Sequence, residues 1–235
     1  GKPIEEVKRE LGLEDITKMA SNENVLGPSP RAVEAMRAAA ESVYLYPDGS
    51  WFRLRQALAQ RLAVSSESII VGNGSDEIIH FLGLTFLNPD DEMIQADPSF
   101  VRYEAAAGLN LAKCHLVPLR DFTHDLVAMR EAVNDRTKLV FIASPNNPTG
   151  TVNTKAEVDA FLADLPAHVV TVFDEAYKEY VEAPDYPETL DYVREDRNVI
   201  VLRTFSKAYA LAGLRVGYGI APPELIGERA TDLAQ

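Results

Sequence analysis

The sequence has little or nothing of the features that mark several classes of protein. Its single cysteine, Cys114, cannot form an internal disulfide and suits a reducing compartment. Apolar runs stay well short of the roughly 18 residues of a membrane span, and the first ten residues predict a helix of mixed charge rather than a signal peptide. With 23 basic and 36 acidic residues, the net charge of −13 argues against a nucleic-acid surface. We therefore expect a cytoplasmic protein that binds neither membranes nor nucleic acids.

Metal and nucleotide signatures are also missing. The histidines lie at positions 80, 115, 124 and 168 without ligand spacing, so we expect surface or helix positions and no metal site. No Gly-Lys-Ser/Thr run is present, which excludes a nucleoside-triphosphate loop. A Gly-x-Gly follows Val71, but the third glycine of a dinucleotide fingerprint falls at Glu77, whose charge opposes a pyrophosphate. A nucleotide-binding Rossmann domain remains an alternative, although it leaves the lysine segment described below unexplained.

From about residue 68 onward, short β-branched runs alternate with amphipathic stretches. The predicted strands are residues 68–71, 92–96, 113–117, 138–143, 169–173, 199–203 and 215–221. The predicted helices are residues 31–42, 75–87, 100–107, 126–133, 155–165, 190–194 and 223–234. This alternation predicts an α/β fold of three α/β/α layers around a mostly parallel sheet of seven strands. Only a loop joins the last two strands, so the final strand is expected to run antiparallel to its neighbour.

One lysine and one arginine follow the predicted strand 199–203 in the segment TFSKAYALAGLRVGY, residues 204–218. Lys207 emerges at the carboxyl end of that strand, where open α/β sheets form their ligand crevices. A lysine amine condenses with an aldehyde when its surroundings keep it partly neutral. Arg215 lies eight residues later, within reach of a phosphate. Taken alone, Ser-Lys is more simply a solvated strand-end lysine, so the other motifs decide its meaning.

Three further motifs follow predicted strands. The loop Ser144–Gly150, with two prolines and a glycine, is rigid enough to aim Asn147 into the crevice. Asp174 follows the strand 169–173 and places a carboxylate at the base of the same crevice, although a helix N-cap is an equally simple explanation. Because neighbours in a strand face opposite ways, only one of Asp174 and Glu175 can face a site. The amides at the helix start that follows Gly74, with the Ser75 hydroxyl, suit a phosphate monoester.

Together these groups meet the needs of pyridoxal 5'-phosphate (PLP). Its aldehyde requires a lysine, its ring nitrogen a carboxylate, and its phosphate amides together with an arginine. We therefore expect this cofactor, with the lysine amine moving the substrate α-proton once it is released from the aldehyde.

At this point the chain resembles the fold-type I PLP-dependent aminotransferases, and within them the histidinol-phosphate aminotransferase branch. The signatures are Ser-Asn-Glu-Asn at 21–24, Tyr-Pro-Asp at 46–48, Gly-Ser-Asp-Glu at 74–77, Pro-Asn-Asn-Pro-Thr-Gly at 145–150, Asp-Glu-Ala-Tyr at 174–177 and Ser-Lys-Ala-Tyr at 206–209. The resemblance implies that Lys207 forms the Schiff base, that Asp174 pairs with the ring nitrogen, and that Asn147 and Tyr177 bond the phenolic oxygen. Lys207, Asp174 and Tyr177 are the predicted catalytic residues. The resemblance assigns the phosphate to Gly74, Ser75, Asp76, Thr204, Ser206 and Arg215.

Other positions take their roles from the same resemblance. Phe100 would stack on the cofactor ring, although an ordinary core aromatic explains it equally well. Tyr46 would reach the phosphate of the partner subunit, which implies a homodimer; without the family match it is a simple turn tyrosine. Asn22 and Asn24 would lie on an arm that covers the substrate.

The resemblance also implies a division of the chain. Residues 1–45 would form an N-terminal arm and helix, residues 46–221 the PLP-binding large domain, and residues 222–235 the start of a helix that leads to a small C-terminal domain. Members of the family carry that domain and this sequence does not include it, so we expect a truncated or partial chain. The implied reaction is amino transfer between histidinol phosphate and 2-oxoglutarate in histidine biosynthesis.

Several alternatives for the function stay open. The same motifs occur in aminotransferases of aromatic amino acids and in threonine-phosphate decarboxylases, so the small-molecule partners are an amino acid or amino-alcohol phosphate and a 2-oxo acid. A catalytically silent PLP-binding or dimerisation module is an alternative of another class. Cofactor binding without a half-reaction on any amino acid would favour that module.

Overall fold

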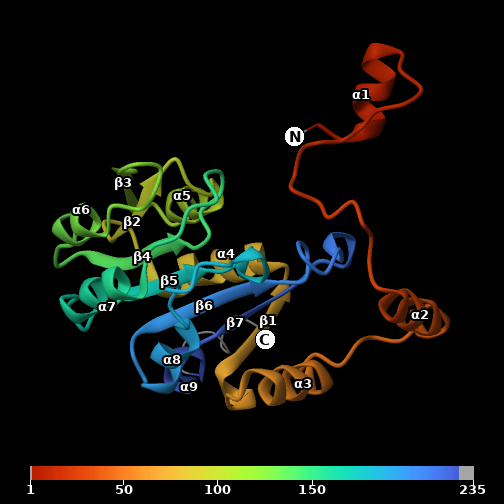
Figure 1. Cartoon of the computed structure of the whole chain (residues 1–235). Helices are drawn as coiled ribbons and strands as arrows, with labels where there is room; N and C mark the ends of the chain where they lie inside the picture. Colours follow the sequence, from red (N-terminus) through yellow and green to blue (C-terminus); the bar gives the residue numbers. More distant parts are fainter. Residues whose placement is uncertain (1, 228–235) are drawn as a thin grey trace.

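The computed structural model describes residues 2–227 and is built on one sheet of seven strands in the order β1-β7-β6-β5-β4-β2-β3 (Figure 1). The strands are β1 Ile69–Asn73, β2 Glu92–Asp97, β3 Lys113–Pro118, β4 Thr137–Ala143, β5 Val170–Asp174, β6 Val199–Thr204 and β7 Val216–Ile220. The β7 strand runs antiparallel to both of its neighbours, and the remaining pairs are parallel. The predicted strands and the reversed last strand are therefore confirmed.

The helices are α1 Ile4–Leu11, α2 Pro30–Ala39, α3 Phe52–Leu62, α4 Ser75–Phe86, α5 Arg102–Leu109, α6 Leu126–Glu131, α7 Lys155–Ala163, α8 Thr189–Arg194 and α9 Pro223–Gly227. The sequence prediction omitted α3, although Leu54, Leu58 and Leu62 recur at the four-residue spacing of a helix face. Of the helix predicted at 223–234, the part up to Gly227 is helical, and residues 228–235 lie outside the described residues.

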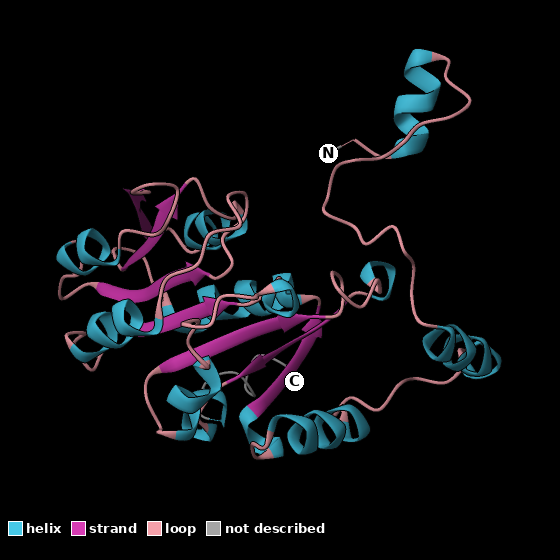
Figure 2. Ribbon diagram, viewed as in Figure 1, coloured by secondary structure: helices cyan, strands magenta, loops and turns pink. Residues whose placement is uncertain are grey.

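Helices cover both faces of the sheet, which confirms the three-layer α/β/α architecture (Figure 2). On one face, Ile78 and Ile79 of α4 and Tyr103 of α5 pack against strand residues such as Leu139 and Leu202. On the other face lie α3, α6, α7 and α8, whose buried residues include Leu58, Met129, Phe161 and Leu190. Burial of these apolar side chains is the main favourable term for the fold.

Two histidines depart from the predicted surface or helix positions. His124 precedes α6 and is only 3% exposed, and burial lowers its pKa to about 4, so the imidazole is neutral at pH 7. His115 lies on β3 and hydrogen-bonds the buried carboxylate of Glu92. The surrounding sequence reveals neither the burial of His124 nor the partner of His115.

The two N-terminal helices stand apart from this body. Figure 1 shows α1 and α2 projecting away from the sheet, and no residue from 2 to 51 is buried. None of the described helices is long and apolar enough to cross a lipid bilayer.

Candidate active site

A cleft of about 760 Å³ opens at the carboxyl ends of β4, β5 and β6, where an α/β sheet is expected to bind ligands. The sequence-predicted site residues that line it are Gly74, Ser75, Asp76, Phe100, Asn147, Asp174, Tyr177, Thr204, Ser206, Lys207 and Arg215. They come from segments up to about 140 residues apart in the chain, and the fold brings them together.

Asp174 supplies a buried carboxylate at the end of β5. Its Oδ2 accepts a hydrogen bond of 2.7 Å from the hydroxyl of Tyr103, and its Oδ1 accepts one of 3.2 Å from the backbone amide of Ala176. Burial raises its pKa to about 6, while the hydrogen bond from Tyr103 and the charge of Lys207 act in the opposite direction. A cationic group placed against this carboxylate would favour its ionised form.

Lys207 lies across the cleft floor in the loop that follows β6. Its Nζ donates a 2.8 Å hydrogen bond to the carbonyl of Ser21 and lies 5.5 Å from the centre of the Tyr177 ring. The Lys207 side chain is thus half-buried between the N-terminal arm and an aromatic face. Such a position suits an amine that must react with a carbonyl.

The start of α4 and the loop before β7 form a cradle for an anion. A Cβ atom at Gly217 would lie 2.2 Å from the Ser75 amide nitrogen, so only glycine allows the N-terminus of α4 to approach β7 this closely. Gly74 has a φ of 76°, and a Cβ there would lie 2.6 Å from the guanidinium of Arg215. Amides at a helix N-terminus and a neighbouring guanidinium are a favourable setting for a phosphate.

Hydroxyl groups complete the cradle. Thr204 Oγ1 donates a 2.9 Å hydrogen bond to Ser206 Oγ and accepts one of 3.1 Å from the Ser206 amide, so the two side chains are held together beside the start of α4. Asp76, in the first turn of α4, pairs with Arg102 at 2.6 Å. That pairing leaves the Asp76 amide, rather than its carboxylate, as the group available to an anion.

The loop after β4 holds Asn147 in the cleft through its neighbour. Asn146 is 2% exposed, and its side chain donates to Thr149 at 2.9 Å and accepts from Ser99 at 2.9 Å. These contacts fix the loop, as the prolines and glycine of its sequence predicted, and the Asn147 side chain remains half-buried at the cleft wall.

The predicted site residues nearest the N-terminus, Asn22, Asn24 and Tyr46, lie in different places. Asn22 donates a 2.9 Å hydrogen bond to the Tyr177 hydroxyl, and Asn24 donates one of 2.9 Å to the carbonyl of Ala208. Both therefore lie beside the cleft. Tyr46 is 101% exposed and does not line the cleft of its own chain.

Sequence reasoning missed several cleft residues, notably Ser21, Arg102 and Tyr103. Tyr103 is fully buried, stacks on Phe141 with ring centres 4.5 Å apart, and meets Phe100 edge-on at 5.5 Å. Tyr103 comes three residues after Phe100, within the helix that the sequence predicted over residues 100–107, and this spacing could have signalled their contact.

The donor set fits PLP in its chemistry. The cleft offers amides, hydroxyls and a guanidinium for a phosphate, a buried carboxylate for a ring nitrogen, and a lysine amine for the aldehyde. Among residues 2–227, no three His, Cys, Asp or Glu side chains gather in a way that could hold a metal ion.

A comparison with protein-family models matches residues 14–232 to aminotransferase class I and II. The chain belongs to the class I and II aminotransferase family. Within that family it is 56% identical over 227 residues to the histidinol-phosphate aminotransferase of Moorella thermoacetica, covering 96% of this chain and 59% of that protein. The histidinol-phosphate aminotransferase of Akkermansia muciniphila is 53% identical over 225 residues, covering 94% of this chain and 61% of that protein.

Solved aminotransferase structures agree with the fold. The crystal structure of histidinol-phosphate aminotransferase from Sinorhizobium meliloti, in complex with pyridoxal-5'-phosphate, matches 100% of this chain and 63% of that one with a TM-score of 0.92 and 30% identity. The L-threonine-O-3-phosphate decarboxylase of Porphyromonas gingivalis shares the fold with a TM-score of 0.80 at 24% identity. The chain spans about 60% of the length of the curated relatives named above.

Proposed function

We propose that this chain is the cofactor-binding part of a PLP-dependent aminotransferase that moves an amino group between histidinol phosphate and 2-oxoglutarate. The observation that carries the proposal is the gathering of an amine, a buried carboxylate and an anion cradle in one cleft, at Lys207, Asp174 and Gly74–Asp76. The names of the relatives at 56% and 53% identity support the choice of substrate.

The chain's own residues divide the work. Bound PLP supplies the electron sink that makes loss of the substrate α-proton feasible. Asp174 keeps a proton on the ring nitrogen, because an ionised carboxylate buried against a cation favours the charged pair. The Lys207 amine would hold the cofactor at its aldehyde carbon and, once the substrate amine displaces it from that carbon, would carry the α-proton. Asn147 and Tyr177 orient the ring through its phenolic oxygen, and the cradle at the start of α4 fixes the phosphate.

The arm has a covering role in this proposal. Asn22 and Asn24 bond to groups at the rim of the cleft, so the segment between them lies over Lys207 and keeps bulk water from the amine. Substrate entry then requires the hydrogen bond between Lys207 Nζ and the Ser21 carbonyl to break.

A homodimer is the proposed assembly. Val43, Tyr44, Tyr46 and Phe52 are at least 61% exposed, and an exposed apolar stretch of this kind is typical of an interaction surface. In a symmetric dimer the stretch would pack on the second copy, with Tyr46 reaching the partner's phosphate cradle. Sedimentation equilibrium tests this, and a monomer at micromolar concentration would contradict it. We also propose the domain boundaries given above, with an N-terminal arm and helix in residues 1–45 and a PLP-binding domain in residues 46–221. A cytoplasmic location is proposed as well, in keeping with the single unpaired Cys114.

The substrate is tested by half-reactions. The purified protein is loaded with PLP and mixed separately with histidinol phosphate, phenylalanine and threonine phosphate, while the visible absorbance of the lysine-bound cofactor and the products are followed. Histidinol phosphate should bleach the absorbance at the lowest concentration and yield its 2-oxo product. Carbon dioxide release from threonine phosphate would instead support the decarboxylase, and bound cofactor with no half-reaction would support the silent module.

A further inference from the structure

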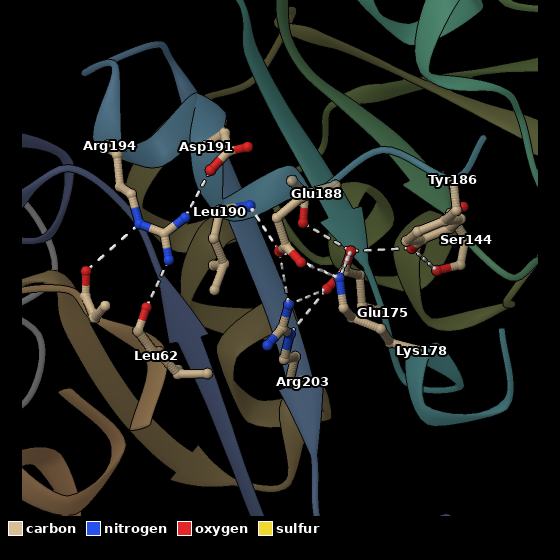
Figure 3. A network of polar contacts seen from close by, with 12 residues as sticks. Leu62, Ser144, Glu175, Lys178, Tyr186, Glu188, Leu190, Asp191, Arg194 and Arg203 are labelled. Atoms are coloured by element: carbon tan, nitrogen blue, oxygen red, sulfur yellow. Dashed lines mark hydrogen bonds and ion pairs between the residues drawn. The ribbon is translucent and has the colours of Figure 1, made fainter. Parts of the chain in front are cut away.

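A buried ion pair joins Glu175 and Arg203 behind the cleft (Figure 3). Glu175 is 1% exposed and Arg203 is 7% exposed. Glu175 Oε2 accepts a 2.8 Å hydrogen bond from Arg203 Nε and lies 2.8 Å from Arg203 Nη2. Its Oε1 accepts hydrogen bonds of 3.0 Å from Tyr186 and 2.7 Å from Thr189. Every oxygen of this carboxylate therefore has partners inside the protein.

The pair does not touch the cleft. Asp174 ends β5 facing Tyr103 of α5, whereas the next residue, Glu175, faces Thr189 of α8 on the opposite side of the sheet. Glu175 and Arg203 are absent from the cleft lining. Any effect of this pair on the site must therefore pass through the backbone or through its electric field.

The pair is connected to the cleft through the backbone, because it links the two strands whose ends carry Asp174 and Thr204. Arg203 immediately precedes Thr204 of the anion cradle, and Glu175 immediately follows Asp174. The Glu175 amide also donates a 2.8 Å hydrogen bond to the Leu202 carbonyl. The ion pair thus fixes the end of β5 against the end of β6, and so sets the spacing of the carboxylate from the cradle.

A third strand joins the same network. The Tyr186 hydroxyl lies 2.8 Å from the carbonyl of Ser144 and 3.0 Å from Glu175 Oε1. Ser144 is the first residue after β4 and opens the loop that carries Asn147. One hydroxyl therefore connects the Asn147 loop to the carboxylate that braces Asp174.

The outer members of the network are less tightly held. Glu188 has a side chain that is 49% exposed and lies 3.7 Å from Arg203 Nη2, and Lys178 lies 3.8 Å from Glu175 Oε1. Charges at such partly exposed positions are screened by water, so Glu188 offers a matched control for Glu175.

We propose that Glu175, held by Arg203, is a positioning residue that fixes Asp174, the Asn147 loop and Thr204 in the geometry that PLP requires. The inference rests on the proposed function of the cleft. A buried ion pair adds little net stability compared with apolar residues of the same volume. Here the pair fixes the end of β5 relative to the end of β6 and places the negative charge of Glu175 behind Asp174.

Glu175→Gln is the direct test, because it keeps the size of the side chain and removes its charge. PLP affinity is measured by equilibrium dialysis, and the visible absorbance of the lysine-bound cofactor is titrated against pH. The affinity should fall about tenfold or more, the size seen when supporting partners of metal ligands are removed. The absorbance midpoint should move to lower pH, because a negative charge that favours the protonated Schiff base is lost. Glu188→Gln should leave both quantities within about twofold of the parent values.

Two further variants keep the test decisive if Glu175→Gln does not fold. Glu175→Gln combined with Arg203→Met removes both buried charges, so its unfolding midpoint should return toward the parent value while PLP affinity stays low. Tyr186→Phe removes only the hydroxyl and should lower the affinity about fivefold, as expected for one lost hydrogen bond.

The outcomes separate this inference from the proposed function. If the parent protein binds PLP and the double variant and Tyr186→Phe bind it equally well, with unchanged absorbance midpoints, the positioning role is wrong and the function stands. If the parent itself does not bind PLP, the proposed function fails and this inference fails with it.

Discussion

The cleft and the N-terminal arm differ in how their residues are held. Asp174 and Thr204 sit on strand ends and are 5% and 6% exposed, fixed by a sheet that is covered on both faces. No residue from 2 to 51 is buried, and the arm reaches the cleft through hydrogen bonds at Ser21, Asn22 and Asn24. These two groups thus come from the core, and the arm contributes contacts that can be made and broken.

Gly217→Ala should have the largest effect on the rigid part of the site. The new Cβ would lie 2.2 Å from the backbone nitrogen of Ser75, and a backbone atom cannot move aside without shifting α4. We expect a loss of about 3 kcal/mol or more in the free energy of unfolding, together with a large loss of PLP affinity. Urea denaturation and PLP titration measure the two effects.

Gly213→Ala is the matched control, because a Cβ there meets nothing within 4 Å. It should leave stability within about 0.5 kcal/mol of the parent. Equal behaviour of the two variants would show that the close approach of α4 to β7 is not needed for the cradle.

Asp174→Asn tests the buried carboxyl through pH. The folded pKa of about 6 lies above the value near 4 of an unfolded aspartate, so between those pH values the folded protein without cofactor keeps a proton that the unfolded chain has released. Its free energy of unfolding should therefore fall as pH rises from about 4 to 6, by about 3 kcal/mol.

The asparagine variant cannot release that proton and should not show this decline. Without cofactor at pH 7 it should be the more stable protein, although it binds PLP less well. Parallel pH profiles of stability for the two proteins, from urea denaturation at each pH, would show that Asp174 is not the group with the raised pKa.

Tyr103→Phe should have a smaller effect. It removes the 2.7 Å hydrogen bond to Asp174 while keeping the ring that stacks on Phe141. Loss of a hydrogen bond to a charged group should cost about 1.5 kcal/mol and raise the pKa of Asp174 further. The shift of the stability profile toward higher pH provides the measurement, and an unshifted profile would rule out the contact.

Tyr46→Phe should have the smallest effect on folding. The side chain is 101% exposed, so the free energy of unfolding of a single chain should change by less than about 0.5 kcal/mol. If Tyr46 serves the partner's site, PLP affinity should fall in the dimer and remain unchanged at dilutions where the dimer dissociates. A stability loss as large as that of Tyr103→Phe would show that the segment around Tyr46 is held like the core.

The sequence predicted the parts of the site that follow from local order. Lys207 and Asp174 could be placed because each comes directly after a buried strand, and the carboxyl ends of parallel strands meet at one edge of a sheet. Strand alternation also separated Asp174 from Glu175 before any contact was known. Most of the sheet followed from the alternation of β-branched and amphipathic runs.

What the sequence did not predict depends on contacts between distant residues. Tyr103 reaches Asp174 across 71 positions, and Arg102 reaches Asp76 across 26. His124 is buried by the packing around it, and nothing in its own segment differs from a surface turn. The omitted helix α3 is a different case, because its period was present in the sequence and its apolar stripe is short.

Reductive trapping of the cofactor tests directly whether Lys207 is the lysine that binds PLP. The purified protein is incubated with PLP, reduced with borohydride, digested and mapped by mass spectrometry. We expect one pyridoxyl group on the peptide that contains Lys207, and none when Lys207→Ala is treated in the same way. A label on another lysine, or an unlabelled protein, would contradict it.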